Sequence, residues 1–140
     1  MEFVLYIFLS FIAGTAPGPK QERTEITIVR ELFRLRNEHK ADSAEQYFAD
    51  TVKVYMKYLR NVPKETITKL DRQFFKAHPK NKFEITAPLQ IADAAGVATV
   101  TVYGKEYLDG TSFQYERIVI KFDCHKRINY FRGFKWKKGE

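Results

Sequence analysis

The chain has 140 residues, with 24 Lys and Arg residues against 17 Asp and Glu residues, and it contains one cysteine. This length fits one domain, and a single cysteine excludes an internal disulfide and a cysteine-rich zinc site. Because 44% of the residues are apolar and 15% are aromatic, the chain can bury a core, and wholesale disorder is excluded. The formal net charge of +7 is compatible with anionic partners and identifies none of them.

The first residues differ in composition from the rest. Residues 1–19 contain a single charged residue, Glu2, and residues 3–13 form an apolar run. This run is too short to cross the hydrocarbon core of a bilayer, which is about 30 Å thick, but it fits the apolar region of a secretory signal. Two features are untypical of such a signal, because no Lys or Arg precedes the run and Pro17 follows the best cleavage position.

We expect an apolar leader over residues 1–19, acting as an export signal or a lipid-proximal anchor, and a folded domain over residues 20–140. The protein is then periplasmic, secreted or membrane-proximal, and membrane contact is confined to residues 3–13. In the alternative interpretation the apolar segment packs on the domain or on a partner, and the protein is cytoplasmic.

Helical periodicity dominates the first half of the domain. Apolar residues recur at helical spacing over residues 24–38, which predicts an amphipathic first helix. Asp42 predicts an N-capped short helix that ends at residues 49–50. Residues 51–59 alternate in polarity and predict a strand with one wetter face. A proline then precedes an apolar stripe over residues 64–77, which predicts a further helix.

The second half is rich in β-branched and aromatic residues. Four such runs predict long strands over residues 83–92, 96–108, 113–123 and 127–136. The Asp109-Gly110 pair is a strong hairpin signal between two of them. The order of elements predicts an α+β domain, in which N-terminal helices pack on the concave face of a strongly curved, mostly antiparallel sheet.

This order resembles the nuclear transport factor 2-like (NTF2-like) superfamily, also called SnoaL-like, whose members have a cone-shaped, cystatin-like α+β fold. The resemblance covers about residues 24–137. It is carried by the junction at residues 47–52 before the first strand, by residues 126–134, which look like the final strand, and by residues 63–79, which are similar to a bacterial branch. It implies a cavity between the helices and the concave face. Because members include enzymes, transport adaptors and binding domains, the function has to be argued from the site.

Isomerase-like members of the family use a carboxylate on the first strand and a protonated acid on a facing strand. The resemblance places these groups at Val54 or Tyr55 and near Arg117, and none of these residues carries a carboxylate. We therefore expect this acid–base chemistry to be absent. A SnoaL-like isomerase or hydrolyase acting on a small apolar substrate, with Tyr55, Asp71 or Arg117 in its cavity, is the alternative.

The histidines and the cysteine predict no catalytic or metal centre. His39, His78 and His125 fall in loops or turns without metal-ligand spacing, so we expect neither a metal ion nor a cofactor. Cys124 and His125 are adjacent at a strand end, where neighbouring side chains point to opposite faces, and no third group is evident that would orient them.

Ligand binding is the hypothesis that the residue types favour. Aromatic side chains and one fixed cation suit a small apolar or carboxylate-bearing ligand. The cavity candidates are Tyr55, Asp71, Tyr103, Tyr115, Arg117 and Trp136. In the alternative interpretation the aromatic residues form core or dimer surface, Arg117 pairs with Glu106 or Glu116, and Asp71 is a solvated helix residue.

Apolar residues on both faces of the long sheet predict a homodimer. Ile118, Ile120 and Phe122 share one face, and Tyr115 and Val119 share the other, so the outer sheet face would stay partly apolar in a monomer.

Two basic clusters are a further feature of the surface. No nucleic-acid-binding motif accompanies them, so we expect solvated edges and no nucleic-acid binding. They comprise Lys76, Lys80 and Lys82, and Arg132, Lys135, Lys137 and Lys138. Taken together, the sequence favours a non-catalytic domain that binds a small ligand or another protein.

Overall fold

The computed structural model describes residues 21–137, so the leader predicted over residues 1–19 and Lys138 lie outside the described residues. The elements are α2 (Thr24–Asn37), α3 (Ala41–Ala44), the 3-10 turn η1 (Glu45–Tyr47), β1 (Phe48–Met56), β2 (Tyr58–Pro63), α4 (Lys64–Ala77), β3 (Lys82–Ile85), β4 (Gln90–Ala94), β5 (Val97–Tyr107), β6 (Phe113–Phe122) and β7 (Ile128–Lys135).

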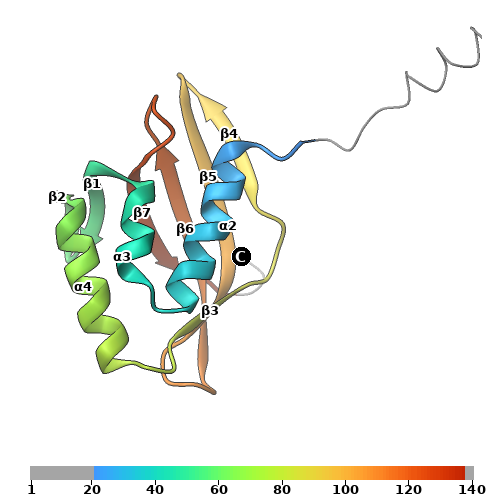
Figure 1. Ribbon diagram of the computed structural model, residues 1–140. Coiled ribbons are helices and arrows are strands. Elements are labelled where there is room, and N and C mark those ends of the chain that lie inside the picture. The colour runs from blue at the N-terminus through green and yellow to red at the C-terminus, as the bar shows by residue number, and fades with distance from the viewer. Residues whose placement is uncertain (1–20, 138–140) are drawn as a thin grey trace, which may run out of the picture.

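The strands form one open sheet in the order β2-β1-β7-β6-β5-β3, with β4 also paired to β5. Only the β1–β7 pair is parallel, and the other pairs are antiparallel. Figure 1 shows α2, α3 and α4 on one side of this sheet. The predicted α+β class, with helices on one face of a mostly antiparallel sheet, is confirmed.

The core lies between α2 and the centre of the sheet. Val29 and Leu32 of α2 have no exposed surface, and neither do Val100 of β5 and Ile120 of β6. The apolar stripe of α2 therefore meets the apolar rows that period-two alternation places on one face of β5 and β6. Burying each of these side chains contributes about 1.5–3 kcal/mol relative to leaving it in water. We call the helix-covered side of the sheet the inner face and the other side the outer face.

The predicted strand over residues 51–59 is wrong in its extent. The chain begins β1 at Phe48 and turns back at Lys57, so that Met56 pairs with Tyr58 in a β1–β2 hairpin. Lys57 adopts a left-handed conformation, with a φ angle of 69°. No Gly or Asn marks this turn, so the sequence carried no turn signal.

The predicted strand over residues 83–92 is also two strands. β3 pairs with one end of the long strand β5, and β4 pairs with the other end. The break falls at residues 86–89, which include Pro88, a residue that has no N–H to donate to a sheet ladder.

The predicted N-cap at Asp42 is wrong as well. Lys40 precedes α3, and Asp42 lies inside the helix, where its carboxylate forms an ion pair with Arg72 of α4. Ala49 and Asp50, expected to end the short helix, belong to β1. The predicted bounds of α4, residues 64–77, are confirmed at both ends.

Within residues 21–137, no helix combines the length and the apolar character needed to cross a membrane.

Gly104 allows β3 to lie close against β5. A Cβ atom at this position would overlap with the ring of Phe83 and with the backbone oxygen of Glu84. We expect Gly104→Ala to lower the free energy of unfolding by about 1–3 kcal/mol, as overpacking typically does. Urea denaturation measures the effect. Thr101→Ala, on the outer face of the same strand, is the control and should cost less than about 1 kcal/mol; an equal cost for the two variants would contradict the packing argument.

Candidate functional site

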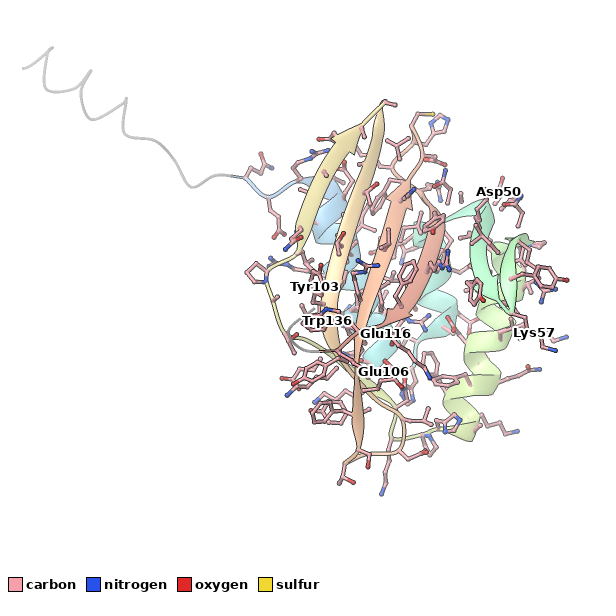
Figure 2. All side chains as sticks on the ribbon, turned by 180° about the vertical axis from the view of Figure 1, so that it is seen from behind. Asp50, Lys57, Tyr103, Glu106, Glu116 and Trp136 are labelled. Atoms are coloured by element: carbon pink, nitrogen blue, oxygen red, sulfur yellow. The ribbon has the colours of Figure 1, made fainter. Side chains whose placement is uncertain are left out.

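Two glutamates lie side by side on the inner face, at the end of the apolar rows of β5 and β6. The register pairs Glu116 with Gly104, so that Glu106 is the diagonal neighbour of Glu116 across the two strands. Both side chains are partly buried. Figure 2 shows both glutamates at the same end of the sheet.

A glycine makes room for the Glu116 carboxylate. A Cβ atom added to Gly133 of β7 would overlap with Oε1 of Glu116, so this carboxylate occupies the space that any other residue would fill with its side chain. Lys135 is the cross-strand partner of Glu116, but no ion pair joins the two side chains.

The helices bring one cation to this site. Arg36 of α2 forms an ion pair with Asp71 of α4, and both side chains are largely buried, with 23% and 16% of their surface exposed. The Arg36 guanidinium lies 5.6 Å from the ring centre of Phe75 and 5.7 Å from that of Phe131, within the range of cation–π attraction. Arg36 is therefore held between the helices and the sheet by one acid and two aromatic rings.

Asn81 binds the second glutamate. Its side-chain amide donates a hydrogen bond to Oε1 of Glu106 at 2.7 Å and another to the Tyr107 carbonyl at 3.0 Å. The Asn81 carbonyl lies 2.9 Å from Nε2 of His39, whose ring stacks on Phe75 at 4.4 Å. Glu106 is thus positioned by a neutral donor, whereas the carboxylate of Glu116 has no hydrogen bond to any residue of the described range 21–137.

The charge at this site is unbalanced, because Asp71, Glu106 and Glu116 surround a single arginine. Burial and the neighbouring Glu106 charge raise the pKa of Glu116 to about 7, and Arg36 opposes this rise. Burial also raises the pKa of Glu106, while its bond from Asn81 and the Arg36 charge lower it. Glu116 is therefore the group that exchanges a proton near neutral pH.

The cavity candidates predicted from the sequence separate onto the two faces. Asp71 is on the inner side, bound to Arg36, and is not a solvated helix residue. Alternation with buried residues turns four of the candidates outward, namely Tyr55, Tyr103, Tyr115 and Arg117. Trp136 packs on Tyr103 and Tyr115 and so belongs to the same face. The prediction that these five residues line the space under the helices is wrong, because strand alternation turns them to the other face.

The alternative pairing of Arg117 with Glu106 or Glu116 is also wrong, because the arginine and the glutamates are on opposite faces. The sequence reasoning placed the acid of the penultimate strand near Arg117 and missed Glu116, one residue away. A signal was available: Glu116, Ile118, Ile120 and Phe122 form one alternating row, and the last three are buried. Arg36 and Glu106 were missed too, since no local pattern links them.

The scattered histidines come into no metal site. Among residues 21–137, no group of three or more His, Cys, Asp or Glu side chains is arranged to hold a metal ion. Cys124 is exposed in the turn after β6.

Solved structures share this architecture. A protein with a cystatin-like fold from Caulobacter vibrioides superposes with a TM-score of 0.67 at 13% identity, over 80% of this chain and 87% of that one. A protein of unknown function with a cystatin-like fold from Methylobium petroleophilum gives a TM-score of 0.64 at 16% identity, over 87% and 84%. An NTF2-like protein of unknown function from Cytophaga hutchinsonii gives a TM-score of 0.62 at 11% identity, over 84% and 94%.

No family model and no curated protein matches the sequence. At these identities the structural likeness establishes the fold and not a function. The chain has the cystatin-like, NTF2-like fold that its sequence resemblance predicted.

Proposed function

We propose that the protein is a small-ligand-binding domain of the NTF2-like type and that its ligand binds at the Glu106–Glu116 pair. The observation that carries the proposal is the surplus of negative charge, three carboxyl groups around Arg36, in a partly buried site. Charge complementarity then favours a ligand that donates hydrogen bonds through an ammonium or hydroxyl group. Phe131, which is partly exposed, offers apolar surface for the rest of such a molecule.

A SnoaL-like isomerase or hydrolyase is the second candidate, and a specific observation favours it. A carboxyl group with a pKa of about 7 is suited to giving and taking a proton near neutral pH. The two candidates differ in one measurement, since an enzyme of this kind exchanges a C–H proton of its bound substrate with deuterated solvent and a binding domain does not.

We also propose that the protein is exported, on the strength of the apolar run over residues 3–13. Expression of the full chain in a secretion-competent host should give a mature protein that lacks most of residues 1–19, detected as a lower intact mass. Recovery of the complete chain in the cytoplasmic fraction would contradict export.

Isosteric probes test the binding proposal. We expect cyclohexylammonium, at ten times its Kd, to stabilise the protein by about 1.4 kcal/mol, seen as a rise in Tm, and cyclohexanol to act more weakly. Binding should strengthen as the pH rises through about 7, because Glu116 then becomes ionised. Glu116→Gln should raise the Kd of cyclohexylammonium at least tenfold.

The control is Glu84→Gln, which removes a carboxylate from the outer face and should leave the response unchanged. A response of Glu116→Gln to cyclohexylammonium equal to that of the wild type would overturn the assignment of the site.

The ionisation of Glu116 predicts a pH dependence of stability. Its folded-state pKa of about 7 lies above the reference value of 4.5, so the folded state holds the proton more tightly. The contribution of this group is fully present below pH 4.5 and is lost as the pH rises to about 7. The loss is at most about 3 kcal/mol.

Urea unfolding at pH 5 and pH 8 measures this loss as the difference between the wild type and Glu116→Gln. The subtraction removes the pH dependence that both proteins share. A difference that does not change with pH would show that Glu116 titrates normally.

A further inference from the structure

The outer face of the sheet carries an excess of cations. Alternation with buried inner residues places six of them on the side away from the helices, and they are Lys53, Lys82, Lys105, Arg117, Lys121 and Arg132. One acid, Glu84 at the edge strand β3, shares this face among the described strands and accepts a hydrogen bond from Tyr107 at 3.2 Å. The outer face of the sheet is thus predominantly positive.

Two of these cations are held rigidly by aromatic rings. The guanidinium of Arg117 lies 4.8 Å from the ring centre of Phe134, and that of Arg132 lies 4.4 Å from the same ring and 4.7 Å from the ring of Tyr55. These contacts restrain both guanidinium groups through cation–π attraction.

Neither arginine has an acidic partner. No ion pair or hydrogen bond joins the side chain of Arg117 or Arg132 to a residue of the range 21–137, and the Nε atoms of both are buried without an acceptor. Buried donors are normally satisfied, so an unsatisfied pair on a positively charged face points to an acceptor supplied from outside.

An aromatic groove lies beside Arg117. It has a volume of about 440 Å³ and is lined chiefly by Tyr103, Lys105, Tyr115 and Trp136. The Trp136 ring centre lies 5.2 Å from that of Tyr103 and 5.6 Å from that of Tyr115. Figure 2 shows Tyr103 and Trp136 next to each other on the sheet.

The register connects the groove to the arginine. Tyr103 is the cross-strand partner of Arg117, and Tyr115 is two residues from Arg117 along β6. Residues at this spacing on one strand are about 7 Å apart. One small molecule can therefore reach both the groove and the guanidinium.

We propose that the outer face binds a ligand composed of a planar ring and an oxyanion, either a carboxylate or a phosphate. The ring lies in the groove against Tyr103, Tyr115 and Trp136, and the oxyanion accepts hydrogen bonds from the Arg117 guanidinium, with Arg132 adding positive charge. Guanidinium groups bind both oxyanions in a bidentate manner, which gives this pairing its geometry.

A second copy of the chain fits this face less well. A two-fold symmetric dimer presents the same patch from both subunits, so the homodimer predicted from the sequence would bring the outer-face cations of one subunit towards those of the other. Like charges across an interface oppose association, whereas an anionic ligand is complementary to them.

Trp136 provides the measurement, because it is the one tryptophan of the chain. Its fluorescence is followed while the full-length protein is titrated with phenyl phosphate, benzoate, benzyl alcohol or inorganic phosphate. We expect saturable changes with phenyl phosphate and benzoate, and at least tenfold weaker binding of benzyl alcohol and inorganic phosphate. The tighter of the first two probes identifies which oxyanion the site prefers.

Matched variants separate the site from the charge of the face. Arg117→Met should raise the Kd of phenyl phosphate at least tenfold. Lys121→Met removes the same charge from the same strand, away from the groove, and should change this Kd less than twofold. Tyr103→Ala gives an independent test through loss of the ring contact, and circular dichroism checks that each variant is folded.

Three results would overturn the proposal. Inorganic phosphate binding as tightly as phenyl phosphate would indicate an adventitious ion only. Equal losses in Arg117→Met and Lys121→Met would mean that net charge alone attracts the probe. A dimer in sedimentation that Arg117→Met dissociates, together with no response to any probe, would assign the face to a second copy of the chain.

Discussion

The pairing of β5 with β6 under α2 is the constraint on which the rest of the molecule depends. The two strands pair over nine consecutive residue pairs, and α2 buries one side of them completely at Val100 and Ile120. Because strand side chains alternate with a period of two, a shift by one residue would turn the apolar rows to solvent. The register is therefore fixed by the core, and it decides which polar residues face inward and which face outward.

Glu106 and Glu116 are consequences of this register. They continue the apolar rows of β5 and β6 to the end where the helices bring Arg36 and Asp71. A core built only for stability would place apolar residues there, since partly burying a carboxylate costs free energy. The pKa of Glu116 is raised because burial disfavours the ionised carboxylate. Side chains with strongly shifted pKa values are concentrated at functional sites.

The same alternation divides the charge of the protein between two surfaces. The acidic site lies under the helices, and a row of cations that includes Lys105, Arg117 and Arg132 lies on the outer face, so the formal net charge of +7 is unevenly distributed over the molecule. A ligand that suits one surface is repelled by the other. The carboxylate-bearing ligand that the residue types suggested belongs, on this argument, to the outer face, whereas the inner site favours a donor group.

The sequence by itself determined what local signals encode. The helix over residues 64–77 was predicted at both ends because a proline, an apolar stripe and a terminating His-Pro pair are contiguous. The class of the fold followed from the order of such segments. The tertiary structure alone decided the hairpin at Lys57, where no turn residue stands, and the meeting of Arg36 with Asp71 across two helices. It also decided that Glu116, and not its neighbour Arg117, faces inward, because one residue of register separates the two faces and only the buried partners of a strand reveal which face is which.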